Sequence, residues 1–280
     1  MIDSDGKVVL VCAVRPEAKP LIEYFDLKEK RDSGFSFEIY HSEDKSLWLL
    51  IGGLGQLRMS FSMGYFAAHI GDAKNIAWLN IGIAGHKNFE FGSGYWVHKI
   101  SSRSAKRSFY PALPSRKKFN CDSHSLMTVD KVETEYGSDD LYDMEAYSFF
   151  NFAKTFSPIE LIQLFKVVSD NNENHIENLT KEMCSHLIEK KISEIELMIA
   201  DLKEKSKILR IKTYSYEDYQ SLTSLCHFTI TQKEELKKLM TRAKALGALK
   251  DLKGKDFTDK KAKEILKFYR SALDNSPIDF

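Results

Sequence analysis

The sequence lacks the patterns of several common protein classes. Its four cysteines stand far apart with no C-x-x-C pair, so neither a disulfide framework nor a cysteine-ligated zinc site is expected. The eight histidines show no H-x-x-x-H spacing. The apolar runs are too short to span a bilayer, and the start of the chain lacks the basic region of a signal peptide. We therefore expect a cytoplasmic protein with no metal site and no membrane partner.

The sequence also has little net charge, but that charge is unevenly distributed. The formal net charge is +1, with 24 basic and 30 acidic residues in 1–204 and 17 basic and 10 acidic residues in 205–280. A lysine-rich helical segment is usually a solvated surface, and a nucleic-acid surface is the rarer alternative. We therefore predict an α/β domain over 1–204, a basic helical extension over 205–280, and no nucleic-acid partner.

Short apolar runs alternate with helical patterns through residues 1–204, which predicts an α/β fold with a largely parallel or mixed central sheet flanked by helices. In the extension, Thr231 and Glu234 have capping-box spacing and predict the start of one helix, and a second is expected around 262–273. The predicted strands are 7–14, 36–42, 46–51, 76–84, 95–100, 126–132 and 164–168. The predicted helices are 21–25, one after Gly55, 143–155 and 176–204, with 101–125 as a long loop.

Glycine-rich phosphate motifs are absent. The GGLG segment at 52–55 lacks G-x-G-x-x-G spacing, and no earlier glycine makes a P-loop of Gly254 and Lys255. GGLG fits a tight strand-to-helix turn, or a turn whose backbone N–H groups approach an anion or a ribose. Together with 82–85 and 169–170 it ends a predicted strand, and ligands of such sheets bind beyond strand carboxyl ends.

Five segments, taken in order, resemble one superfamily. They are CAVRPEAKPL (12–21), IGGLGQLRMS (51–60), LNIGIAGH (79–86), DMEAYSFFNFA (143–153) and KVVSDN (166–171). Together they resemble the nucleoside phosphorylase and nucleosidase superfamily, most closely the 5′-methylthioadenosine/S-adenosylhomocysteine nucleosidases. The resemblance implies a mixed sheet flanked by helices, cleavage of an N-glycosidic bond without a cofactor, a small nucleoside substrate and a homodimer. It does not cover residues 205–280.

The resemblance also implies roles for three carboxyl groups. Asp170, beside Ser169, would be the acid that protonates the purine, and Glu17 would be the base that activates water. Glu145 would accept hydrogen bonds from the ribose hydroxyls, with Met144 packed against the sugar. The pairing of an acid with a base is the logic of glycoside hydrolysis. Considered alone, Glu17 also fits a first-turn helix acid and Asp170 a helix N-cap.

Other positions depart from the family pattern. Gly53 and Gly55 would approach the nucleoside, but Asn80 and Ile83 stand where the phosphorylases carry arginine and serine. Losing that cation and hydroxyl weakens a phosphate site and favours water as the nucleophile. Val132 stands where the nucleosidases place a stacking phenylalanine. An aromatic ring to replace it would come from Phe109, Tyr110 or Tyr142.

The combined expectation is hydrolysis of a purine nucleoside, or of a 5′-thio-substituted adenosine, to free base and sugar. A phosphate-dependent phosphorylase and a nucleoside-binding module with little catalysis remain as alternatives. The helix after GGLG has more apolar width than one buried face needs, at Met59, Met63, Tyr65 and Phe66. We expect that helix to form the homodimer interface.

Overall fold

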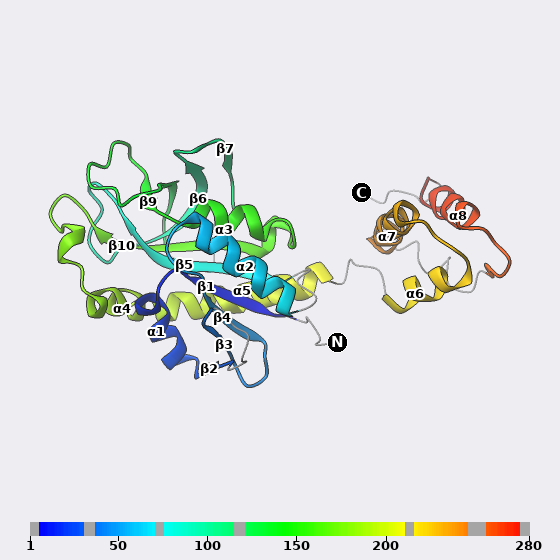
Figure 1. The fold of residues 1–280 in the computed structure, drawn as a ribbon, viewed down its shortest axis with the longest axis horizontal. Helices are drawn as coiled ribbons and strands as arrows, with labels where there is room; N and C mark the ends of the chain where they lie inside the picture. Colours follow the sequence, from blue (N-terminus) through cyan, green and yellow to red (C-terminus); the bar gives the residue numbers. More distant parts are fainter. Residues whose placement is uncertain are drawn as a thin grey trace. The chain divides into compact units, whose positions relative to one another are not determined.

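The computed structural model describes residues 6–30, 37–70, 76–114, 121–210, 216–245 and 256–274. Contacts divide the chain into two compact units, residues 1–207 and 208–280. Figure 1 shows the mixed α/β unit and the helices of the second unit. The boundary predicted at residues 204 and 205 falls inside helix α5 (Ile192–Arg210), so the change in composition there does not coincide with a break in secondary structure.

Parallel strands form the centre of the first unit. Strand β1 (Val8–Cys12) lies between β4 (Leu47–Ile51) and β5 (Ala77–Gly85), and β10 (Ile162–Asp170) pairs with the other edge of β5. Antiparallel strands β3 (Ile39–His41) and β2 (Lys28–Glu29) continue the sheet beyond β4. The mixed central sheet that the sequence predicts is therefore confirmed.

The sheet closes on itself beside β5. Strand β10 pairs with β6 (Gly94–Ser102), β6 with β8 (Ser123–Thr128), β8 with β9 (Leu141–Asp143), and β9 returns to the end of β5 at Gly85. A short strand β7 (Ala105–Phe109) pairs with β6 outside this ring. The ring brings the end of β5, the end of β10 and the segment before residue 146 together.

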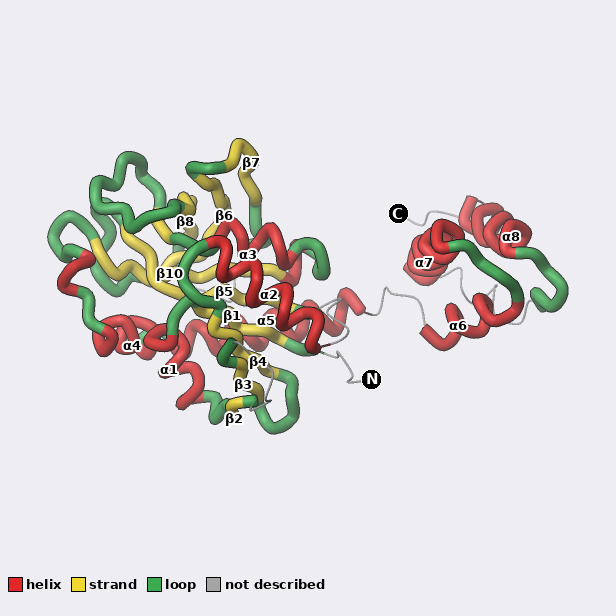
Figure 2. The backbone as a smooth tube through the Cα atoms, in the orientation of Figure 1, coloured by secondary structure: helices red, strands yellow, loops and turns green. Residues whose placement is uncertain are grey.

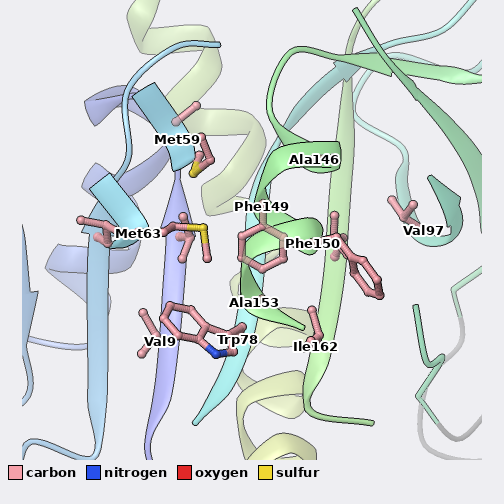
Figure 3. Packing of buried hydrophobic residues seen from close by; sticks show 14 of the residues in the cluster. Val9, Met59, Met63, Trp78, Val97, Ala146, Phe149, Phe150, Ala153 and Ile162 are labelled. Carbon is pink, nitrogen blue, oxygen red and sulfur yellow. The ribbon is translucent and has the colours of Figure 1, made fainter. Parts of the chain in front are cut away.

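Two helices cover one face of the central strands. Figure 3 shows Met59 and Met63 of α2 (Gln56–Ile70) packed toward Phe149 of α3 (Ala146–Ala153), with Trp78 of the sheet beneath them. Helices α1 (Arg15–Tyr24) and α4 (Lys181–Glu189) form a second contacting pair that also packs on the sheet. The residues of β1 are all fully buried, as expected for a strand covered on both faces.

Two sequence-based predictions within residues 101–204 are wrong. Residues 101–125 are not one long loop, because they contain β7 and the start of β8, as the tube in Figure 2 shows. Residues 176–204 are not one helix. They form a 3₁₀ turn at Ile176–Asn178, then α4, which Thr180 caps by accepting a hydrogen bond from Met183 N, and then α5.

The second unit consists, in its described part, of helices α6 (Tyr216–Leu225), α7 (Ile230–Ala245) and α8 (Ala262–Asp274) around a small apolar core. Helix α7 begins one residue before Thr231, and its reciprocal cap is made by Thr229 and Gln232 instead of Thr231 and Glu234. None of the described helices is long and apolar enough to cross a membrane.

Candidate active site

A pocket opens where β1, β5 and β10 end, with about 650 Å³ of empty space counting its mouth. This is the edge at which ligands of such sheets bind. The lining residues are Ala13, Val14, Glu17, Leu54, Ile83, Ala84, Gly85, Val129, Val132, Glu133, Tyr142, Asp143, Met144, Glu145, Ser169, Asp170 and Ile176.

Glu17 lies in the first turn of α1, and its buried carboxylate faces the pocket. Oε2 accepts hydrogen bonds from the backbone N–H of Ala13 (2.8 Å) and Val14 (3.1 Å), and Oε1 accepts one from Ile83 (3.0 Å). Glu17 therefore accepts hydrogen bonds from backbone N–H groups at the start of its helix and also lines the pocket. Burial raises the pKa of Glu17, although Lys166 and the three N–H groups act in the opposite direction.

Asp170 is the last residue of β10, and its side chain does not cap a following helix. Oδ1 accepts the hydroxyl of Ser169 at 2.5 Å, and Oδ2 accepts the hydroxyl of Tyr136 at 2.5 Å. Asp170 and Ser169 are buried and both line the pocket. Because a carboxylate offers about four acceptor positions, these two bonds leave capacity for a ligand.

Glu145 stands directly before α3 and accepts a hydrogen bond from Gly55 N at 2.6 Å. Gly55 has φ +86°, a conformation that glycine adopts without steric cost, and this turn aims its N–H at Glu145. Burial, and next the nearby Asp143 carboxylate, raise the pKa of Glu145 to about 7. The glycine turn therefore contributes to the pocket by holding the carboxylate of Glu145.

Lys166 is a site residue that the sequence analysis missed. It is buried in β10, and its ammonium lies 2.9 Å from Asp143 Oδ2. A side chain at Gly82 would come within 2.7 Å of Glu17 Oε1 and 3.3 Å of Lys166 Nζ, so both groups lie against this glycine. Burial alone would lower the pKa of Lys166, but the carboxylates of Asp143, Glu17 and Glu145 raise it.

The structure places the other predicted site residues differently. Met144, Ile83 and Val132 line the pocket. Asn80 and Gly53 are not among the described lining residues. The Asn80 amide donates to Val11 O at 2.9 Å inside the sheet, and Gly53 N donates to Ala13 O at 2.9 Å in the turn.

The three aromatic residues offered as stacking partners have separate locations. Tyr142 lines the pocket, at 5.9 Å from the Tyr136 ring. Phe109 instead packs in the core against Tyr147 and Phe150, which rules it out as a base-stacking residue. Tyr110 is exposed and is not among the described lining residues.

Three potential metal ligands, His86, His124 and Asp139, lie close together, and His86 is the residue directly after the pocket residue Gly85. His86 Nδ1 accepts the backbone N–H groups of Asn88 (3.1 Å) and Phe89 (3.0 Å), so the proton of the neutral ring is on Nε2. Nε2 faces Asp139 Oδ1 at 3.2 Å. A nitrogen that carries a proton has no lone pair for a metal, so this tautomer favours a structural histidine–aspartate contact.

The charge of the pocket wall is acidic. Five of its residues are Glu17, Glu133, Asp143, Glu145 and Asp170, and none of its described lining residues is a lysine or arginine. The nearby Lys166 contacts Asp143, and Arg103 forms an ion pair with Glu133. The wall therefore presents several acceptors for hydroxyl and N–H donors.

Comparisons with known proteins identify the fold. Neither a protein-family model nor a curated protein matches the chain. Among solved structures, it is similar to a 5′-methylthioadenosine nucleosidase of Arabidopsis thaliana (TM-score 0.58, 19% identity, 69% of this chain and 95% of that chain). A Campylobacter jejuni 5′-methylthioadenosine/S-adenosylhomocysteine nucleosidase has TM-score 0.55 and 14% identity, covering 70% of this chain and 98% of that one. A futalosine hydrolase mutant of Helicobacter pylori has TM-score 0.53 and 12% identity, covering 69% and 98%.

The chain thus has the nucleoside phosphorylase/nucleosidase fold, as its five sequence segments predict. At 12–19% identity, these similarities establish the fold and leave the reaction and its substrate to be argued from the site.

Proposed function

We propose that the protein hydrolyses the N-glycosidic bond of a purine nucleoside, or of a 5′-thio-substituted adenosine, to free base and sugar. The observation that carries this proposal is the presence of Glu17, Glu145 and Asp170 around one pocket. These residues come from three distant segments, and each is buried with a polar atom of its side chain in a defined hydrogen bond.

Each carboxyl group has a distinct chemical role in this reaction. The bond between the sugar carbon and the purine nitrogen breaks, and the electron pair leaves with the base. Asp170 donates a proton to the base, while a water oxygen forms the new bond to the sugar carbon and its proton passes to Glu17. Glu145 accepts the ribose hydroxyls. General acid catalysis of this kind typically contributes about 10²–10⁴-fold to the rate.

The acidic wall favours water over phosphate as the nucleophile. A phosphate dianion would meet five acidic residues, and no described lining residue supplies a fixed cation. Phosphate sites normally provide arginine, lysine or several convergent N–H donors. The pocket N–H groups of Ala13, Val14 and Ile83 already donate to Glu17.

The test is to incubate the protein with adenosine, inosine and 5′-methylthioadenosine, with and without phosphate, and to measure the released base. Release without phosphate supports the proposal. A strict requirement for phosphate would show a phosphorylase, and binding without release would show a binding module. Either result would overturn the hydrolase assignment.

The activity is expected to fall in acid because the proposed base must be ionised. Burial raises the pKa of Glu17 above its ordinary 4.5, so activity present at higher pH is lost as pH falls through that raised value. Glu145, with a pKa of about 7, must also lose its proton to accept sugar hydroxyls fully. We expect kcat/KM to fall at least about tenfold between about pH 8 and about pH 5, with circular dichroism confirming an intact fold. A profile that is flat across this range would contradict the requirement for an ionised Glu145.

We also propose a homodimer formed by α2, but through other residues of this helix than those that the sequence analysis named. Met59, Met63 and Phe66 are buried inside the subunit's own core. The outer face of the helix instead exposes Leu57 (84%) and Phe61 (66%), one helical turn apart.

The exposed α2 face continues to the pocket mouth at Leu54, which is 60% exposed and lines the pocket. A second copy packed there would cover the apolar side chains of α2 and help to close the pocket. Phe61→Asp is therefore expected to shift the protein from dimer to monomer in light scattering at micromolar concentration. Ile230→Asp, at a residue of the second unit that is 84% exposed, is the control and should leave the mass unchanged. A monomeric wild type would reject the dimer.

A further inference from the structure

The proposed acid is held by a tyrosine that the sequence analysis did not single out. Tyr136 is buried, and its hydroxyl donates to Asp170 Oδ2 at 2.5 Å across 34 residues of chain. Ser169 donates to the other oxygen, so each oxygen of Asp170 has its own hydroxyl donor. Hydrogen bonds to a charged acceptor are among the strongest in proteins, so this pair fixes the carboxyl orientation.

The backbone at Tyr136 indicates that this contact is enforced. Tyr136 has φ +44°, in the left-handed region that bulky residues other than glycine rarely adopt. Such conformations persist where the surrounding contacts determine them, and they occur often at functional sites. Here the conformation directs a large side chain inward to a single carboxylate.

Contacts on both sides anchor the acid-side loop, which we define as residues 130–140. Gln56 Nε2 donates to Asp130 Oδ1 at 2.9 Å, and Asp139 Oδ1 lies 3.2 Å from His86 Nε2. Asp140 accepts a hydrogen bond from Ser125. The loop is therefore tied to α2, to the end of β5 and to β8, with Tyr136 between these attachments.

The opposite side of the tyrosine–aspartate pair is formed by Gly85. A Cβ at Gly85 would collide with Asp170 Oδ2 and lie 2.9 Å from Tyr136 Cε1, both closer than real Cβ contacts. The absence of a side chain at the end of β5 therefore makes room for the pair. Asp170 lines the pocket, whereas Tyr136 is not among its described lining residues, so Tyr136 contacts the acid from outside the ligand space.

We propose that Tyr136 is the positioning residue of the acid: its hydroxyl orients Asp170 so that the carboxyl group faces the purine. This inference rests on the proposed function, because it assigns Tyr136 a role in the same reaction. Burial, and next the bond to Asp170, raise the pKa of Tyr136 above its ordinary value, so the hydroxyl keeps its proton at neutral pH. Tyr136 therefore acts through Asp170 and takes no proton from the substrate.

The test compares Tyr136→Phe with Ser138→Ala, which removes a hydroxyl from the same loop without touching Asp170. For Tyr136→Phe we expect kcat for base release to fall about 10–100-fold with KM within about threefold, the loss typical of a hydrogen bond to a charged group. Because the acid must carry a proton, kcat should also decline on the alkaline side of its pH profile. In Tyr136→Phe this alkaline limb should move to higher pH, because a donor that stabilised the charged carboxylate is gone. Ser138→Ala should match the wild type in both measurements.

Gly85→Ala places a methyl group against both Asp170 and Tyr136 and should disturb their contact from the other side. It should therefore also lower kcat and move the alkaline limb to higher pH, which keeps the test valid if Tyr136→Phe folds poorly. Unchanged kcat and an unchanged limb in both variants would overturn the inference while base release by the wild type left the proposed function standing. A higher kcat in Tyr136→Phe would also overturn it, because the hydroxyl would then be competing with the base.

Adenine binding tests the Tyr136–Asp170 pairing separately from the proposed function. Adenine affinity is measured by calorimetry across the same pH range for the wild type, Tyr136→Phe and Ser138→Ala. If the wild type releases no base, the proposed function fails, and a pH dependence of adenine affinity that moves only in Tyr136→Phe still supports the pairing. An identical dependence in all three proteins, or no adenine binding by any of them, overturns it.

Discussion

Replacing Asp170 by asparagine is expected to lower kcat for base release by about 10²–10⁴-fold, equivalent to about 3–5.5 kcal/mol of barrier. Asparagine has nearly the same shape as aspartate, and the hydroxyls of Ser169 and Tyr136 can reorient to serve its amide. The amide cannot deliver a proton to the departing base. We therefore expect nucleoside binding within about tenfold of the wild type while turnover collapses.

Single-turnover base release and calorimetric binding on the same preparations measure the two effects separately. Asp122→Asn is the matched control, because Asp122 is an exposed residue before β8 whose backbone carbonyl makes its sheet contact. Its kcat should stay within about twofold of the wild type, as for most surface substitutions. A loss below about tenfold in Asp170→Asn, or a loss of binding as large as the loss of turnover, would refute the acid role.

The family resemblance of five segments implied roles for Asp170, Glu17 and Glu145, and each of the three stands at a recognisable junction. Buried strands precede Glu17 and contain Asp170, and Glu145 stands at the start of an apolar helix. Strand ends of one sheet meet at one edge, so local patterns predict a shared location. Asn80, which only the family resemblance pointed to, lies within β5, and its amide donates into the sheet to Val11.

The partners of these acids could not be found in the same way. Tyr136 reaches Asp170 from a polar loop, and no periodic pattern announces that contact. Lys166 did leave a signal, since a lysine inside the buried run LFKVV needs a nearby acid to stay charged. Which acid it meets depends on the closed ring of strands that brings β9, and therefore Asp143, beside β10. That arrangement is part of the tertiary structure, and no local sequence pattern predicts it.

Lys166→Met is expected to destabilise the fold by about 3–5 kcal/mol, measured as the free energy of unfolding in urea at neutral pH. Methionine fills a similar volume, so the loss of unfolding free energy comes from the removed charge and not from a cavity. Asp143 would lose its partner at 2.9 Å, and Glu17 and Glu145 would lose the cation that opposes their burial. The pKa of Lys166 is raised in the folded protein, so its stabilisation is complete below the unfolded lysine pKa of about 10.4 and is lost only as pH rises through the folded value.

The deficit of the Lys166→Met variant should shrink as pH falls from about 8 to about 5. Glu145, whose pKa is about 7, takes up a proton in that interval, and the raised pKa of Glu17 acts in the same direction, so the uncompensated charge falls. Adding Asp143→Asn should recover part of the loss, because removing both members of a buried pair costs less than removing one. Lys19→Met, which breaks only the exposed pair with Glu23, should cost less than about 1 kcal/mol. If Lys166→Met costs no more than Lys19→Met, water must screen these groups, and Lys166 does not compensate buried negative charge.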